Sequence, residues 1–266
     1  MAVIFHDTYA ENIPRDSAEA QRNTGYILHP AVQATRYLDA CVAVAGTGTA
    51  AFLHELAHDW SEATLHGYDI STCLFPPADT LPLNVSLILY DACQDVPSSL
   101  QGKYDFVHGR LMAAGLSASE STGVVKNLAQ LLKPGGAMQW EECDFTAVCY
   151  LPGGAHSSID TASKMGKLFS TAMRLRFEAG MSWPQNVHTE AAAVHRVRGT
   201  RERLTANRMQ SIFAWARLQS ARGSKWALSM EYLEELEQKA HKDIQSGCYG
   251  SFDVHIAWGF RPRIPS

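Results

Sequence analysis

The chain has 266 residues, of which 46% are hydrophobic and 19% charged, and a formal net charge of -4. This balance is typical of a globular protein with a sizeable core, and it excludes a basic field that would attract nucleic acid or an anionic membrane. The first residues, MAVIFHDTYAEN, lack the basic region of a signal peptide, and no apolar run reaches the roughly 18 residues of a membrane-spanning helix. Six scattered cysteines without a C-x-x-C pair predict reduced thiols in a cytoplasmic protein.

The pattern up to about residue 150 predicts strands that alternate with helices. Short apolar runs predict five strands, the first of them buried, at residues 40–46, 63–69, 85–90, 104–108 and 137–144. One helix is expected over residues 50–59, and a second from a cap at Ser117 or Ser119 to the sequence KPGG at 133–136. This alternation indicates an α/β fold with a mainly parallel sheet that is covered on both faces.

The pattern changes after residue 154. Helices are expected over residues 158–179, 206–221 and 226–245, with a sixth strand at 192–204. The last strand, residues 252–260, alternates clearly, with Asp253 and His255 on its polar face. We therefore expect an N-terminal cap or lid at 1–36 and a single domain at 37–266, with a helical insertion at about 155–247.

The segment AVAGTGTAAFLHELAHDW, residues 43–60, contains two competing motifs. His54 and His58 fit the zinc-protease pattern H-E-x-x-H. The extended form of that pattern needs Gly at position 61 and His at position 64, where this chain has Ser61 and Thr64. His66 is a further candidate ligand, but nothing around it fixes a metal geometry. We therefore expect no metal, and histidines on or near the solvent side of a helix.

The second motif is a glycine loop. Gly46, Gly48 and Ala51 fit G-x-G-x-x-G/A, follow a predicted strand and open a helix, as nucleotide binding requires. Asp69 ends the next predicted strand, about twenty residues on, where a carboxylate accepts hydrogen bonds from ribose hydroxyls. Two alternatives remain open at this point: a tight glycine turn in a fold that has lost its ligand, and an NAD-dependent dehydrogenase.

Five segments in a fixed order resemble a known family: CVAVAGTGTAAFLHELA, GYDIS, LYDA, YDFVHGRLM and LLKPGGAMQWEECD. They are similar to class I S-adenosylmethionine (SAM) methyltransferases, most of all to the fungal LaeA-like and secondary-metabolite methyltransferases. The resemblance covers roughly residues 20–150 and implies a Rossmann-like fold. Its sheet would have seven strands, mainly parallel, with an antiparallel last strand. LKPGG and the final alternating strand argue against a dehydrogenase.

The resemblance also implies site residues. Seven would bind the cofactor SAM: Gly46, Thr47 and Gly48 below its methionine end, Asp69 at the ribose, and Ile70, Asp91 and Ala92 at the adenine. His108, as the general base, Arg110 and Glu142 are the catalytic candidates, with His108 and Arg110 at the mouth of the site. Tyr26, Trp140 and Glu141 are the substrate-binding candidates. The alternatives without a functional role are that Asp91 caps a turn, that Arg110 forms a surface ion pair, and that Glu141, Glu142 and Asp144 are solvated loop acids.

The glycine loop departs from the family pattern at two positions. Val44 stands where the family has an acid that helps to place the methionine ammonium, and Ala50 stands where it has glycine. Loss of one charge-assisted contact weakens binding by about 1.5–3 kcal/mol, or ten- to a hundred-fold. We therefore predict that SAM or S-adenosylhomocysteine (SAH) binds, but weakly.

Three functions follow from this combination. The first is a SAM-dependent methyltransferase acting on a small secondary metabolite, with methyl transfer by proximity and orientation. The second is a methyltransferase-fold cyclase or pericyclase that transfers no methyl group. The third is a non-enzymatic regulator, ranked lowest because no charged arm or partner-binding tail is evident. The expected partner is a small-molecule substrate, without nucleic acid or membrane, and the oligomeric state stays open, a homo-oligomer included.

Overall fold

The computed structural model describes residues 39–112, 115–116, 118–177, 188–193 and 201–263. The expected N-terminal cap, with Tyr26, lies outside the described residues. The helices are α4 (Ala51–Asp59), α5 (Ala118–Leu131), α6 (Asp160–Phe177), α7 (Arg201–Ala221) and α8 (Met230–Gln245), with a 3-10 turn η1 (Ala78–Thr80). The strands are β1 (Cys41–Ala45), β2 (Thr64–Asp69), β3 (Val85–Leu89), β4 (Tyr104–Arg110), β5 (Leu132–Cys143), β6 (Cys149–Leu151), β7 (His188–Ala193), β8 (Tyr249–Ser251) and β9 (Asp253–Phe260).

The main sheet has the strand order β3-β2-β1-β4-β5-β9-β7. Strands β1 to β5 pair in parallel, whereas β9 runs antiparallel to both of its neighbours, β5 and β7. The expected α/β fold, with a mainly parallel sheet and an antiparallel last strand, is therefore confirmed. The strand order reverses beside β1, and in such sheets this is the point where ligands bind at the carboxyl ends of the strands.

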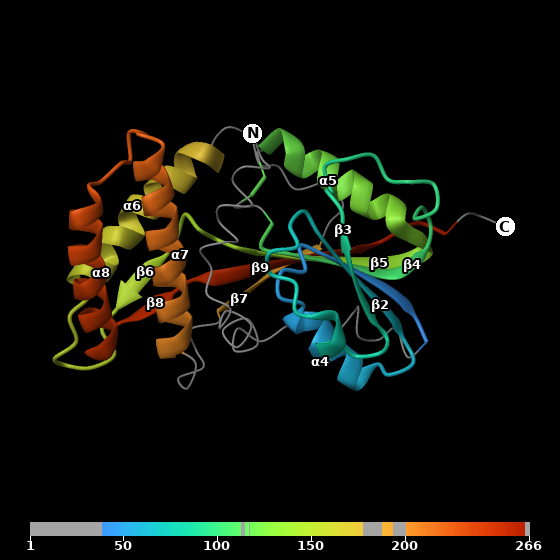
Figure 1. Ribbon diagram of the computed structural model, residues 1–266, viewed down its shortest axis with the longest axis horizontal. Helices are drawn as coiled ribbons and strands as arrows, with labels where there is room; N and C mark the ends of the chain where they lie inside the picture. The colour runs from blue at the N-terminus through green and yellow to red at the C-terminus, as the bar shows by residue number, and fades with distance from the viewer. Residues whose placement is uncertain (1–38, 113–114, 117, 178–187, 194–200, 264–266) are drawn as a thin grey trace.

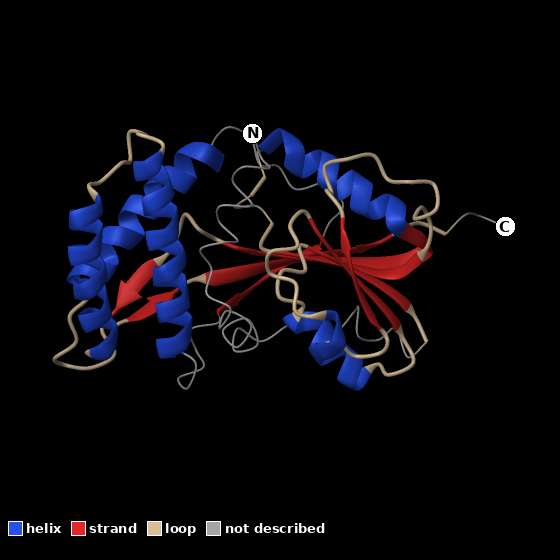
Figure 2. Ribbon diagram, viewed as in Figure 1, coloured by secondary structure: helices blue, strands red, loops and turns tan. Residues whose placement is uncertain are grey.

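Helices α4 and α5 lie on opposite faces of the sheet (Figures 1 and 2). Alternation along β1 explains this arrangement, because successive side chains of a strand point to opposite faces. Val42 and Val44 pack in one core cluster with Phe52 of α4. Ala43 and Ala45 pack in another, which contains the apolar side chains of α5.

The three later helices form a lobe beside the main sheet, together with a small two-stranded antiparallel sheet of β6 and β8 (Figure 1). Its core contains Met165, Phe213 and Leu233, one from each helix. The buried carboxylate of Asp243 on α8 accepts hydrogen bonds from the backbone N–H groups of Thr161, at 2.8 Å, and Ala162, at 2.9 Å. These bonds satisfy donors at the first turn of α6, which has no earlier carbonyls to pair with.

The sixth strand matches its expected position only in part. Of the expected range 192–204, residues 192–193 end β7 (His188–Ala193), and residues 194–200 lie outside the described residues. Residues 201–204 are helical, because α7 begins at Arg201. Met209, Ile212, Phe213 and Ala216 are buried at helical spacing, so packing in the lobe favours a helix in this part of the chain. The range expected to be a helical insertion, about 155–247, also supplies β7 to the main sheet.

All six cysteines are free thiols in the structure. Among the described residues, no helix is both long enough and apolar enough to cross a lipid bilayer.

Candidate functional site

A cleft lies where β1, β2 and β3 end, on the face of β1 opposite α4. Parallel strands place their carboxyl ends together, so the segments that follow them meet at one edge of the sheet. Five residues predicted from the sequence line this cleft: Gly46, Asp69, Ile70, Asp91 and Ala92. Seven further residues line the cleft and were not predicted from the sequence: Ala45, Tyr68, Tyr90, Cys93, Met112, Gly115 and Leu116.

The glycine loop bounds the cleft and has three residues in the left-handed backbone region. Gly46 has φ 66°, Gly48 φ 51° and Ala50 φ 58°. A Cβ atom at Gly46 would lie 2.9 Å from Cγ of Met112, so the loop approaches its neighbours closely there. Ala50 is fully buried at the N-cap of α4 without a side-chain cap. An alanine in this region is strained by about 1–2 kcal/mol relative to glycine, because glycine adopts left-handed backbone angles without a Cβ clash.

Asp69 joins the end of β2 to the glycine loop. Its Oδ2 accepts a hydrogen bond from the backbone N–H of Gly48, at 2.9 Å, and its Oδ1 accepts one from Ser71, at 3.1 Å. The backbone N–H of Thr47 donates to the carbonyl of Tyr68, at 3.1 Å, and holds the loop against the same strand. Each carboxylate oxygen has two acceptor positions, so this group can also accept from ligand hydroxyls.

Asp91 organises the turn after β3. Its Oδ1 accepts from the backbone N–H of Cys93, at 2.8 Å, and its Oδ2 from Nε2 of Gln94, at 3.2 Å. The turn-capping interpretation of Asp91 is therefore present in the structure. The same side chain lines the cleft next to Ala92, so capping also fixes its position for a ligand.

His108, Arg110 and Glu141 meet on the α4 face of the sheet, away from the residues that line the cleft. His108 Nε2 lies 3.0 Å from Glu141 Oε1, and Arg110 Nε lies 3.4 Å from Glu141 Oε2. Gln139, two residues before Glu141 on β5, donates to Oε1 at 2.8 Å. The His108 side chain is fully buried, so the expectation that it lies at the mouth of the site is wrong, and Arg110 forms no mere surface pair.

Glu141 is the acidic group of this cluster. Burial alone would raise the pKa of Glu141. The hydrogen bond and charge of His108, the guanidinium of Arg110 and the amide of Gln139 outweigh burial and lower that pKa below its ordinary value. Glu141 is therefore the anionic centre of a buried polar group, which sequence reading did not anticipate. The signal available was the period-2 spacing of Gln139 and Glu141, which puts both on one face of a strand.

Val44 is the neighbour of His108 across the sheet. The two residues are paired positions of β1 and β4, and both side chains pack near Phe52 of α4. Val44 is 3% exposed and points to the face opposite Ala45, which lines the cleft. An acid at position 44 would therefore lie beside His108 and would not line the cleft directly.

Trp140 and Glu142 lie on the other face of β5. Trp140 Nε1 donates to Oε1 of Glu142 at 3.0 Å, and both residues are buried. Asp144 accepts from the N–H and hydroxyl of Thr146 and so caps the following turn. Glu141 and Glu142 are therefore not solvated loop acids, and neither they nor Trp140 line the cleft described above.

The HELAH motif lies on α4. His58 is exposed and contacts the Asp59 carboxylate, with Nδ1 and Oδ1 3.1 Å apart, and His54 is half-buried. In the part of the chain that the structure describes, no three His, Cys, Asp or Glu side chains converge on a metal position. The placement of the histidines on or near the solvent side is as expected.

Comparison with known proteins links this chain to fungal methyltransferases. It is 40% identical over 111 residues to the methyltransferase grgD of Penicillium sp, a match that covers 39% of this chain and 38% of that protein. It is 30% identical over 103 residues to the secondary metabolism regulator laeA of Coprinopsis cinerea, covering 38% of this chain and 24% of that protein. The sequence comparison supports the resemblance to class I methyltransferases of the LaeA-like group.

These matches are partial. The aligned parts span less than two fifths of either relative's own length. No family model matches the chain. Among solved structures, YjhP from E. coli has a TM-score of 0.48 at 17% identity, covering 91% of this chain and 98% of that one.

Proposed function

We propose that this chain is a SAM-dependent methyltransferase that acts on a small molecule of fungal secondary metabolism. The observation that carries the proposal is Asp69, a cleft carboxylate at the end of β2 that also holds the N–H of Gly48 in the glycine loop. This pairing of an acid with a glycine loop is the arrangement that binds a nucleoside in such folds. The similarity to grgD supports methyl transfer over other uses of the cleft.

The described residues would hold the cofactor in three parts. Asp69 would accept from the ribose hydroxyls, Ile70 and Asp91 would face the adenine, and Gly46 would lie below the methionine end. Thr47 and Gly48, predicted for the same role, do not line the cleft. When bound, SAM supplies an electrophilic methyl group. The protein's own contribution would be to orient the acceptor and exclude water, as is usual when reaction depends on proximity.

We assign the buried cluster a positioning role. His108 and Arg110 orient the Glu141 side chain, and the backbone carbonyl of Glu141 accepts from the N–H of Leu111, at 3.0 Å. Leu111 directly precedes Met112, which lines the cleft. The cluster thus fixes the segment after β4 at the edge of the cofactor site. This replaces the general-base role first expected for His108, because a fully buried side chain cannot reach an acceptor without rearrangement.

A non-methylating cyclase is the second candidate. The departures of the glycine loop from the family pattern at Val44 and Ala50 favour it, because both lie in the part of the loop expected to hold the methionine end of SAM. Asp69 and Asp91 remain in the cleft, so a cyclase that keeps the nucleoside as a structural ligand has the same site.

Incubation with methyl-labelled SAM and a fungal metabolite extract tests methyl transfer. We expect label in an organic-soluble product with the unaltered protein and with Asp79→Ala, an exposed acid on η1. Asp69→Ala should lose the labelled product. Conversion of a metabolite that requires SAM but leaves the label in SAM would favour the cyclase, and absence of any conversion would oppose both enzymes.

A further inference from the structure

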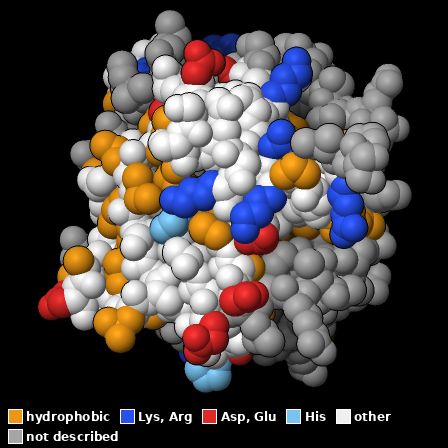
Figure 3. All heavy atoms as spheres, turned by 90° about the vertical axis from the view of Figure 1, so that its right-hand side faces the viewer, with side chains coloured by type: hydrophobic (Ala, Val, Ile, Leu, Met, Phe, Trp, Pro, Cys, Tyr) orange, Lys and Arg blue, Asp and Glu red, His pale blue; other side chains and the backbone are white. Residues whose placement is uncertain are grey.

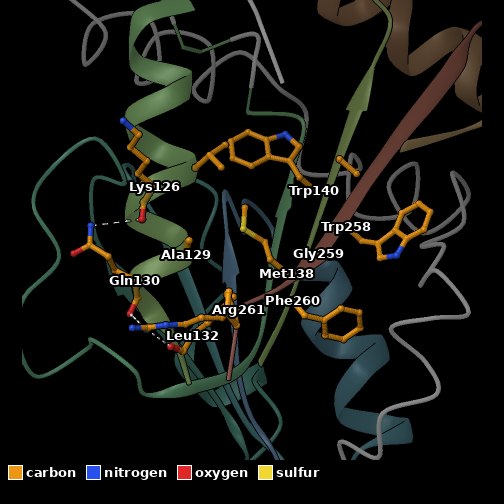
Figure 4. A pocket seen from close by; sticks show the side chains of 13 residues that line it. Lys126, Ala129, Gln130, Leu132, Met138, Trp140, Trp258, Gly259, Phe260 and Arg261 are labelled. Carbon is orange, nitrogen blue, oxygen red and sulfur yellow. Dashed lines mark hydrogen bonds between the residues drawn. The ribbon is translucent and has the colours of Figure 1, made fainter. Parts of the chain in front are cut away.

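A second cavity lies between α5 and the sheet, apart from the cofactor cleft. It has a volume of about 400 Å³, within the range that small-molecule sites occupy. Figure 4 shows α5 along one side, with Met138 and Trp140 of β5 facing it. None of its lining residues lines the cofactor cleft.

Small residues of β9 form the floor of this cavity. Gly259 pairs with Met138 and Ala257 with Trp140, so these four residues share the α5 face of the sheet. Trp258 and Phe260 point away from α5, as Figure 4 shows. A Cβ atom placed on Gly259 would meet no heavy atom within 4 Å. The floor is therefore open, and a ligand ring can lie against it.

The polar lining of the cavity is cationic. Lys126 and Arg261 line it together with the amide of Gln130, and no acidic residue does. Arg261 Nη1 donates to the carbonyls of Leu132 and Gln130 and so ties the end of β9 to the end of α5. Within the described ranges, neither Lys126 nor Arg261 pairs with a carboxylate. On the side of the molecule that carries the C-terminus, Lys and Arg side chains stand beside exposed hydrophobic ones (Figure 3).

From this geometry we infer that the cavity between α5 and β9 binds a lipophilic organic anion, an aromatic ring system that carries one carboxylate or sulfonate. The ring lies between Ala129 of α5 and the floor at Gly259, and the anionic group faces Lys126 and the guanidinium of Arg261. Apolar burial supplies the affinity, and the cationic rim selects the charge of the ligand. This inference does not depend on methyl transfer.

Fluorescence titration with 1-anilinonaphthalene-8-sulfonate tests the site, because this probe combines an apolar ring system with one sulfonate. We expect saturable binding of one probe per chain. Gly259→Leu fills the floor and should weaken binding by at least about tenfold, since the new side chain occupies the space of the ring. Ala129→Leu narrows the cavity from the helix side and should weaken probe binding to a similar extent. Gly123→Leu, on the exposed part of α5 outside the cavity, should leave the affinity within about twofold.

Charge selection is tested with the neutral probe N-phenyl-1-naphthylamine and with Lys126→Gln. The substitution should weaken binding of the anionic probe by about threefold and leave that of the neutral probe unchanged. Circular dichroism establishes which variants fold. If Gly259→Leu does not fold, the affinity of Ala129→Leu for the anionic probe tests the site. If the folded cavity variants bind the anionic probe with unchanged affinity, the proposed location of the site is wrong. If Lys126→Gln changes the affinity for both probes equally, the proposed preference for anions is wrong.

Discussion

Val44 and His108 are neighbours on β1 and β4, and both side chains lie beneath α4. Position 44 is where the family resemblance places an acid. The structure puts that position against a buried histidine instead of in the cofactor cleft. Nδ1 of His108 has no hydrogen-bond partner among the described residues, so it is the group that a new acceptor would meet.

Replacing Val44 with Asp should therefore change stability more than ligand affinity. Burying the carboxylate costs about 2 kcal/mol of unfolding free energy even with His108 as its partner. Val42→Asp, on the same strand face but paired with Phe106, should lose at least about 1 kcal/mol more. Urea unfolding compares the two. A tenfold gain in SAH affinity for Val44→Asp would show that position 44 acts on the ligand directly.

The strain at Ala50 predicts opposite effects for two adjacent alanines. Ala50→Gly should raise the free energy of unfolding by about 1 kcal/mol, because glycine adopts the left-handed backbone of that position freely. Ala51→Gly, in the first turn of α4, should lower it by about 1 kcal/mol. Thermal melts of both variants provide the measurement. The same sign for both would mean that the backbone at residue 50 is not left-handed.

The lowered pKa of Glu141 predicts that the free energy of unfolding decreases at acidic pH. Since its pKa in the folded chain is below the ordinary value of 4.5, its stabilising contribution is complete above that value. The contribution is lost as the pH falls through the lower, folded-state pKa. Glu141→Gln should cost about 3 kcal/mol near neutral pH, because it breaks a buried charge cluster.

The difference in unfolding free energy between the unaltered chain and Glu141→Gln should shrink in urea unfolding as the pH falls below the ordinary pKa of 4.5. Glu235→Gln is the matched control, because Glu235 also pairs with a cation, Lys239, but on the exposed surface of α8. Its effect should be small at every pH, since exposed pairs contribute little. A pH-independent loss in Glu141→Gln would mean that the Glu141 charge does not contribute.

The first five strands could be located because each contains a short apolar run. Only Val85 of β3 is buried, however, and β5 begins at Leu132, before the expected residue 137. Asp69 and Asp91 follow such runs, so their meeting at the cleft could be predicted as well. The bounds of β7 could not be predicted, and only its last two residues lie in the expected strand at 192–204. Its three alanines carry no alternation of polarity that would mark a strand. The three-residue strands β6 and β8 are too short to show a period.

The burial of His108 was also missed. A histidine before an arginine at the end of a strand is compatible with either a reactive or a structural role. Its spacing from Phe106 does indicate a shared strand face, and Phe106 is fully buried. What the sequence cannot convey is that Glu141, thirty-three residues later, reaches that histidine from the neighbouring strand.

The central claim is that Asp69 and the glycine loop bind SAM, and calorimetric titration with SAM and SAH tests it most directly. The unaltered protein and Asp79→Ala should bind either ligand with the same affinity. Asp69→Ala should lose at least about tenfold in affinity, because it removes the ribose acceptor and the loop contact to Gly48 together. If the unaltered protein gives no heat with either ligand, the cofactor assignment is wrong. It is also wrong if Asp69→Ala binds SAM and SAH with the affinity of the unaltered protein.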